Sequence, residues 1–164
     1  MNKTEDIMKT IYTKEQNKSH VNSVLNNALF CSISMANKNE PYVVTVNFGF
    51  DDKYLYFHSQ QTGKKVDMIA ANPNVCFEAN YGGEVFSNKQ SCNWGTKFRS
   101  VIGYGKAELL LNKRDKVKAL LAIMYKYSGN NDHEFNEHVL AHTNIYRIKL
   151  DNVQARQNHL YWQD

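Results

Sequence analysis

The chain has 164 residues, of which 42% are hydrophobic and 22% are charged, and its formal net charge is +4. This length suits one domain with a substantial core, and this composition excludes a disordered chain. The positive charge forms no basic stripe, so we expect no nucleic-acid partner, whereas a small anionic ligand would suit it. We therefore expect a single globular domain over residues 1–164.

Membrane association and export are not expected. No apolar run reaches the about 18 residues that a membrane span needs, and the first residues, MNKTEDIMKTIY, are too polar for a signal peptide. Cys31, Cys76 and Cys92 are an odd set without metal-type spacing, so we expect free thiols. A reducing cytoplasm is the simplest compartment for such a chain.

The first half of the chain predicts one helix and three strands. Thr13 and Gln16 form a capping box, and apolar residues at helical spacing follow, which predicts an amphipathic helix over 14–28. Residues 29–36, 41–50 and 54–58 then alternate apolar and polar side chains. Because short turns separate these three segments, we expect antiparallel neighbours.

The segment TGKKVDMI predicts a helix with an unusual first turn. Thr62 is the expected N-cap and Pro73 ends the segment, so Lys64 and Lys65 fall in the first turn. There the helix dipole and the free backbone N–H groups favour anions and repel cations. Either both lysines point into water at a small cost, or a phosphate binds the N–H groups and both lysines together.

The second half predicts further strands and helices. A strand from about Asn74 leads into residues 81–97, which we expect to be a long irregular connection, and a strand over 98–110 follows. Asn112 and Gly129 bound an amphipathic helix; a short helix over 134–141, a strand over 143–151 and a polar tail complete the chain. The order predicts an α+β domain built on an antiparallel sheet or small barrel.

Few residues carry recognisable chemistry. Thr45, Asn47 and Gly49 give one strand a polar face, where glycine would admit a flat ligand or another backbone. His138 and His142 are four residues apart on an expected helix, but the H-E-x-x-H order is absent and we predict no metal site. No nucleophile motif or G-x-G-x-x-G occurs, so an enzyme of this sequence would depend on a cofactor.

Two stretches resemble a known family. PYVVTVNFGFDDKYLYFHSQQTGKKVDMIAANPNVCFEAN and CNWGTKFRSVIGYGKAELL are similar to the pyridoxamine 5′-phosphate oxidase-like flavoproteins, in the branch that contains 5-nitroimidazole-resistance proteins. The similarity covers about residues 25–128. It implies a mainly antiparallel, six-stranded split β-barrel with flanking helices, the FMN-binding split barrel. It also implies a homodimer with FMN in two clefts at the interface.

The resemblance assigns part of the flavin site to one strand. The backbone of Val43, Val44 and Thr45, together with Asn47, would border the flavin ring. Thr45 stands where many relatives have proline, which alters one edge of this wall. The segment LDNVQARQNHLYWQD also lacks the arrangement of Trp and Arg by which the true oxidases bind substrate, so pyridoxamine phosphate oxidation is not expected.

The remaining assignments come from the next strand, the lysine pair and the partner subunit. His58 and Ser59 would line the ring or the ribityl chain, and His58 is the candidate catalytic residue. Lys64 and Lys65 take the place of the family's basic pair that binds the FMN phosphate. The residues that would approach the same flavin from the second subunit are Trp94, Arg99 and Ser100.

The sequence leaves three functions open. The first is an FMN-dependent oxidoreductase that takes electrons from NAD(P)H or another reductant and reduces a small planar acceptor, such as a nitro compound or a quinone-like molecule. The second is a flavin-binding carrier, sensor or electron-transfer protein without turnover. The third is a haem-binding variant of the same barrel.

Overall fold

The computed structural model describes residues 14–158 of the chain. These residues form nine strands, four α-helices and one short 3-10 helix. In chain order they are α1 (Lys14–Asn27), β1 (Cys31–Asn37), β2 (Glu40–Val46), β3 (Phe48–Phe50), β4 (Tyr54–Ser59), α2 (Lys64–Ala71), β5 (Asn74–Phe86), η1 (Ser91–Asn93), β6 (Gly95–Lys106), β7 (Glu108–Leu109), α3 (Lys113–Ser128), α4 (Glu137–His142), β8 (Asn144–Lys149) and β9 (Val153–Asn158).

The strands form two antiparallel sheets, one in the order β2-β1-β5-β6-β9 and the other in the order β3-β4-β8-β7. Two runs of chain pass from one sheet into the other, because Asn47 alone separates β2 from β3 and Ala107 alone separates β6 from β7. The arrangement confirms the predicted α+β fold of antiparallel strands. The described chain has nine strands instead of the expected six because each of these runs is interrupted at the crossing and because β9 was not predicted.

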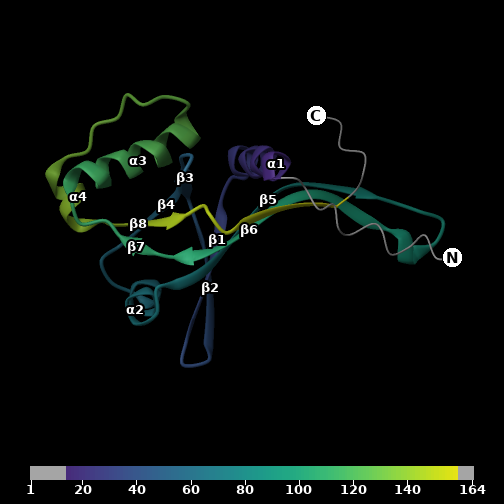
Figure 1. Ribbon diagram of the computed structural model, residues 1–164, viewed down its shortest axis with the longest axis horizontal. Helices are drawn as coiled ribbons and strands as arrows, with labels where there is room; N and C mark the ends of the chain where they lie inside the picture. The colour runs from purple at the N-terminus through teal and green to yellow at the C-terminus, as the bar shows by residue number, and fades with distance from the viewer. Residues whose placement is uncertain (1–13, 159–164) are drawn as a thin grey trace.

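The main hydrophobic core lies where the inner faces of the two sheets meet α1 and α2. Its largest fully buried side chains include Phe48, Phe57, Phe77, Leu25 and Ile33. A second cluster lies on the other side of the small sheet, where α3 and α4 cover Tyr56 and Ile145. Figure 1 shows α3 beside the small sheet, while the β5–β6 hairpin of the large sheet extends past α1 away from the body.

Gly49 allows α3 to pack directly on the small sheet. A Cβ atom at this position would lie 2.4 Å from backbone atoms of Ala122 and Ile123. The close approach that the sequence suggested at Gly49 is therefore made by the backbone of α3. No side chain other than hydrogen fits there without moving the helix.

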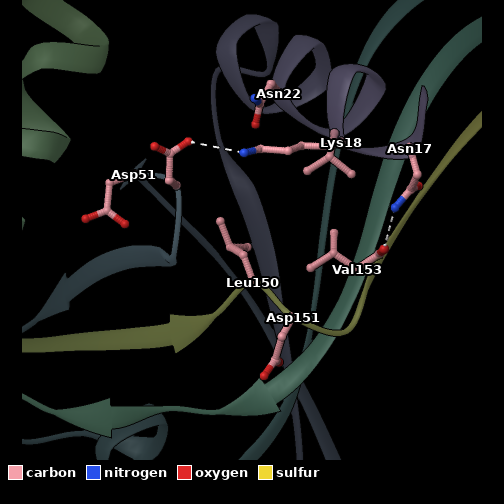
Figure 2. Close-up of a pocket in the computed structure, with 9 residues that line it drawn as sticks. Asn17, Lys18, Asn22, Asp51, Leu150, Asp151 and Val153 are labelled. Carbon is pink, nitrogen blue, oxygen red and sulfur yellow. Dashed lines mark hydrogen bonds and ion pairs between the residues drawn. The ribbon is translucent and has the colours of Figure 1, made fainter. Parts of the chain in front are cut away.

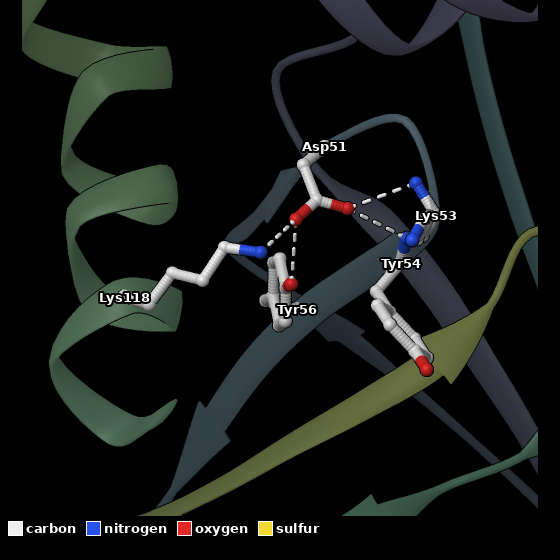
Figure 3. A network of polar contacts seen from close by, with 5 residues as sticks. All are labelled: Asp51, Lys53, Tyr54, Tyr56 and Lys118. Carbon is white, nitrogen blue, oxygen red and sulfur yellow. Dashed lines mark hydrogen bonds and ion pairs between the residues drawn. The ribbon is translucent and has the colours of Figure 1, made fainter. Parts of the chain in front are cut away.

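Asp51 ties the β3–β4 turn to α3 (Figure 3). Its carboxylate accepts hydrogen bonds from the N–H groups of Lys53 and Tyr54 at 2.9 Å, from the Tyr56 hydroxyl at 2.8 Å and from the Lys118 ammonium at 2.7 Å. Partial burial alone would raise the pKa of this carboxyl, but the hydrogen bonds outweigh that effect and lower the pKa to about 2. Burial, and then the hydrogen bond to Asp51 and its charge, raise the pKa of Tyr56 to about 12, against a smaller opposing effect of Lys118.

Both helix ends that Asn112 and Gly129 predicted are confirmed for α3. The Asn112 side chain accepts a hydrogen bond from the Asp115 N–H, and Gly129 ends the helix with a φ of 75°. The first helix ends one residue before the predicted boundary. No helix within residues 14–158 is long and apolar enough to cross a membrane.

The prediction of an irregular connection over 81–97 is wrong. β5 continues to Phe86 and β6 begins at Gly95, so both strands extend into this segment and form a long hairpin. A register shift between Gly82 and Glu84 interrupts the pairing, and Gly82 and Gly83 both have positive φ angles. This bulge breaks the alternation by which strands are recognised in a sequence.

β9 corrects the prediction of a polar tail. Residues 153–158 pair with β6, from Phe98 opposite Asn158 to Gly103 opposite Val153. Only Val153 and Ala155 give this strand an apolar side, which is too little for a clear period of two. The strand forms because β6 offers it a free edge.

Candidate functional site

The lysine pair lies in the first turn of α2, but Gly63 is the N-cap instead of the predicted Thr62. Gly63 has a φ of 118°, and no side chain caps this end of the helix. The N–H groups of Val66 and Asp67 donate to the Gly63 carbonyl oxygen at 2.9 and 3.1 Å. Within the described chain, the N–H groups of Lys64 and Lys65 have no hydrogen-bond acceptor and remain available to a ligand.

These residues open onto a groove of about 260 Å³, which we call the lysine groove. Three elements build it: the inner side of β2, the carboxyl end of β4 and the first turn of α2. Its lining residues are Tyr42, Val44, Ser59, Gln60, Thr62, Gly63, Lys64, Lys65 and Val66. Nothing lies within 4 Å of the place where a Cβ atom of residue 63 would be, so the approach to the helix N-terminus is open.

The two lysines have different partners. The Lys64 ammonium lies 2.6 Å from the Glu40 carboxylate and 5.1 Å from the centre of the Tyr42 ring. Lys65 has no carboxylate partner among the described residues: its ammonium lies 3.5 Å from the carbonyl oxygen of His58 and 5.9 Å from the centre of the Phe57 ring. Burial lowers the pKa of Lys65. Of the two ammonium groups, that of Lys65 is therefore the one without a competing anion.

The predicted strand wall is divided between two faces of β2. Val44 lines the lysine groove. The side chains of Val43 and Thr45 alternate to the outer face of the large sheet, where Val43 is 60% exposed. Asn47, also exposed, stands at the crossing between β2 and β3.

His58 and Ser59 are likewise divided. Ser59 is buried, lines the lysine groove and donates a 2.7 Å hydrogen bond to the Gln60 carbonyl oxygen. The His58 side chain alternates to the opposite face of β4 and is not among the groove residues. Partial burial, and then the nearby Lys65 ammonium, lower the pKa of His58. Only the backbone of His58 reaches the site, through its contact with Lys65.

The residues assigned to a partner subunit do not line the lysine groove of their own chain. Trp94 follows η1 at the end of the long hairpin and donates from Nε1 to the Asn88 carbonyl oxygen. Arg99 is only 5% exposed, with Nη1 3.1 Å from the Tyr81 hydroxyl and Nε 2.9 Å from Oε1 of Gln157. Ser100 alternates to the other face of β6.

A larger cavity, of about 560 Å³, lies between α1 and the β3–β4 and β8–β9 turns (Figure 2). Asp51, Asp52 and Asp151 contribute three carboxylates to its lining, while Lys18 contributes the single ammonium. Lys18 and Asp52 pair there at 3.8 Å. This charge balance repels a phosphate, so the smaller lysine groove is the better anion site.

His138 and His142 pack against each other on α4. The rings of His138 and His142 stack with their centres 4.2 Å apart, and Nδ1 of His142 lies 2.9 Å from the His138 carbonyl oxygen. No group of three or more His, Cys, Asp or Glu side chains within the described residues is arranged to hold a metal ion.

No sequence signal marks Tyr42, which lines the groove, or Glu40, which pairs with the groove residue Lys64. Glu40 and Tyr42 lie in β2, and Glu40 is 24 residues from Lys64 along the chain. No local pattern links positions so far apart. The hairpin of β1 and β2 would have to be registered against α2 before either residue could be assigned.

The two crossing sheets, with the lysine groove beside α2, define a split-barrel protein. The chain belongs to the pyridoxamine 5′-phosphate oxidase family, whose family model matches residues 17–157. This confirms the resemblance seen in the sequence and the predicted fold class. No curated protein matches the chain.

Solved structures of similar proteins support the fold. A proposed 5-nitroimidazole antibiotic resistance protein from Bacteroides thetaiotaomicron is 26% identical, with a TM-score of 0.78 over 92% of this chain and 88% of that one. A FAD and heme binding protein from Mycobacterium smegmatis is 14% identical, with a TM-score of 0.81 over 97% of this chain and 77% of that one. A FAD-binding protein from Mesorhizobium loti is 22% identical, with a TM-score of 0.66 over 93% and 99% of the two chains. At these identities the last two indicate the fold alone.

Proposed function

We propose that the protein binds FMN with its phosphate in the lysine groove and acts as an FMN-dependent oxidoreductase that reduces a small planar acceptor. One observation carries the proposal: two ammonium groups, two unbonded N–H groups and an uncapped helix N-terminus meet in one open groove. A phosphate dianion satisfies all of them together, and the helix dipole adds to the attraction.

A terminal phosphate fits this groove better than the pyrophosphate of FAD. The monoester carries close to two negative charges at one end of the molecule, which suits the Lys64 and Lys65 ammonium groups and the helix N-terminus. FAD would carry its negative charge on a pyrophosphate in the middle of the molecule and would require further space for an adenosine beyond it. The two FAD-binding proteins of the same fold make this distinction the first one to test.

A bound flavin would supply the transfer of electrons from NAD(P)H to the acceptor. Lys64 and Lys65 would hold the phosphate, Ser59 would lie beside the ribityl chain, and the β2 backbone from Val43 to Thr45, with Asn47, would border the ring. We assign His58 a positioning role, because its carbonyl oxygen lies against the Lys65 ammonium. The similar 5-nitroimidazole resistance protein favours a nitro compound as acceptor.

We also propose that the protein is a homodimer with the second wall of each flavin cleft contributed by Trp94, Arg99 and Ser100 of the other subunit. The lysine groove, built by β2, β4 and α2, is open to solvent, whereas tight flavin binding needs burial on more than one side. The outer face of the large sheet supports a second copy as the occupant, because all five strands carry exposed side chains there. Its apolar members include Val43 at 60%, Tyr104 at 55% and Phe98 at 37% exposure. A two-fold interface would duplicate every contact and give two equivalent sites.

The flavin itself gives the first test. Flavin would be released by heat from the purified or reconstituted protein and identified by chromatography, with FMN as the expected result. FAD alone, or no flavin after reconstitution, would contradict the proposal. A haem-binding variant of the barrel would instead show a Soret absorption band.

Turnover is tested on the FMN-loaded protein under anaerobic conditions. NADH or NADPH should bleach the flavin, and a nitroimidazole or a quinone should restore its colour. If the flavin binds but neither nucleotide bleaches it at a useful rate, the protein is a carrier, sensor or electron-transfer protein.

A further inference from the structure

Glu40 holds one of the two groove lysines by an ion pair. Its carboxylate lies 2.6 Å from the Lys64 ammonium, and the two side chains are 62% and 52% exposed. The hydrogen bond with Lys64 lowers the pKa of Glu40, and the same bond raises the pKa of Lys64. In the absence of a ligand, the Lys64 ammonium is therefore paired with the Glu40 carboxylate.

The β1–β2 hairpin fixes the backbone of Glu40, while its side chain is largely exposed to water. Lys38 and Asn39 form the turn between β1 and β2 with φ angles of 47° and 64°, the left-handed pair that suits a tight hairpin. Glu40 follows at once, in register with Asn37 of β1. Its carboxylate projects from the end of this hairpin toward α2 and is not part of the groove lining.

Lys64 lies between two alternatives. Its ammonium is 5.1 Å from the ring of Tyr42, which lines the groove, and its own chain also lines the groove. A rotation of the long lysine side chain away from Glu40 therefore brings the charge toward a ligand without any movement of the backbone. Lys65 needs no such rotation, because no carboxylate of the described chain pairs with it.

We propose that Glu40 is an internal competitor of the flavin phosphate for Lys64, so that FMN binding transfers this ammonium from a carboxylate to a phosphate and Glu40 sets the affinity. The inference rests on the proposed function of the lysine groove. The two lysines then have unequal roles. Lys65 is available to the phosphate from the start, whereas Lys64 binds the phosphate only after it leaves Glu40. This exchange also makes Glu40 a determinant of selectivity, because the competition acts on the phosphate and not on the flavin ring.

The expected change in FMN affinity is small because the Glu40 and Lys64 side chains are both exposed to water. Exposed ion pairs are screened by water and salt, so the competition is modest. We expect Glu40→Gln to bind FMN about two- to fivefold more tightly than the unaltered chain at low salt. Riboflavin, which has the same ring and no phosphate, should bind both proteins equally. The advantage of Glu40→Gln should shrink as salt is added.

The experiment is fluorescence titration of the full chain and its variants with FMN and with riboflavin. The matched control is Glu137→Gln, which removes the carboxylate from another exposed ion pair, that with Lys113 at the start of α3. This control should leave both affinities unchanged. Titration of the labelled Glu40 carboxyl by carbon NMR gives an independent readout: its pKa should rise when FMN is added.

The outcomes separate the inference from the proposal beneath it. If the unaltered chain binds FMN but Glu40→Gln binds it no more tightly, or gains equally for riboflavin, the competition does not exist. An unchanged Glu40 pKa in the FMN-loaded protein would have the same meaning. If the unaltered chain does not bind FMN at all, the proposed function fails and this inference fails with it.

Discussion

Lys65 offers the most direct single-residue test of the anion site. Its ammonium is half-buried at the groove and has no competing carboxylate among the described residues, so Lys65→Ala should weaken FMN binding by about 1.5–3 kcal/mol, the usual range for a hydrogen bond to a charged group. Lys113→Ala is the control, because Lys113 also lies in the first turn of a helix but pairs with Glu137 and does not line the groove. Fluorescence titration would compare them, and equal affinities would remove the phosphate assignment.

Asp51 predicts a pH-dependent part of the stability. The pKa of Asp51 is lowered from 3.8 to about 2 in the folded chain, so its ionised carboxylate stabilises the fold above about pH 4 and that contribution is lost as the pH falls toward about 2. After allowance for solvent screening, Asp51→Asn should cost about 1–2 kcal/mol at pH 7. The difference from the unaltered chain should shrink toward pH 2.

Urea unfolding at several pH values measures this difference. Asp52→Asn is the matched control, because the exposed Asp52 carboxylate has one ion-pair partner among the described residues, Lys18 at 3.8 Å. It should cost little at any pH. A cost for Asp51→Asn that stays constant from pH 7 to pH 2 would show that shape, and not charge, makes this contact important.

The local part of the site could be predicted from the sequence and the distant part could not. Lys64 and Lys65 were found because a lysine pair after a turn signal is a pattern within a few residues. The division of Val43 from Val44, and of His58 from Ser59, follows from strand alternation but needs knowledge of which face meets α2. The pairing of Glu40 with Lys64 depends on the packing of a hairpin against a helix, which no local pattern encodes.

At the level of elements, α3 can pack closely on β3 because residue 49 is a glycine and has no Cβ atom. Gly49→Ala would place a methyl group 2.4 Å from the backbone of Ala122 and Ile123, and backbone cannot move aside as a side chain can. We expect a loss of about 1–3 kcal/mol in the free energy of unfolding, measured with urea. Gly105→Ala is the comparison, because its new Cβ would meet Cγ2 of Ile148 at 2.8 Å and should cost less. Equal losses in the free energy of unfolding of the two variants would mean that α3 can move away from β3 at little cost.

Elements with complete local signals were predicted well, and those that depend on a partner were not. Asn112 and Gly129 mark the two ends of α3 within the sequence itself. The ends of β5 and β6 have no such signals, since the bulge at Gly82 and Glu84 hides the period of two. β9 has only two inward apolar residues and is held by pairing with β6, so its existence depends on a strand far earlier in the chain.

For the whole molecule, we expect a dimer with two FMN molecules, and we expect a charge on the outer face of the large sheet to disrupt both. Arg99 is a poor place for this test because its side chain is buried in its own chain. Tyr104→Glu is better, since Tyr104 is 55% exposed on that face, and Tyr125→Glu on α3, at 54%, is the matched control. Light scattering and flavin stoichiometry are the measurements. A monomer that binds FMN with unchanged affinity would contradict the dimer and the partner residues together.

On the ribosome, the chain emerges in an order that leaves the small sheet incomplete until β8 is made and the large sheet incomplete until β9 is made. β5 and β6 can pair as soon as they appear, but Tyr54 of β4 waits for Lys149 of β8, and Phe98 of β6 waits for Asn158 of β9. Until then the core lacks Tyr146, Ile148 and Ala155. The nascent chain therefore exposes apolar surface until these two strands are made, and such surface favours aggregation. A chain that stops at Thr143 should accordingly be digested by protease far faster than the full chain, and comparable resistance would show that the earlier strands fold without their partners.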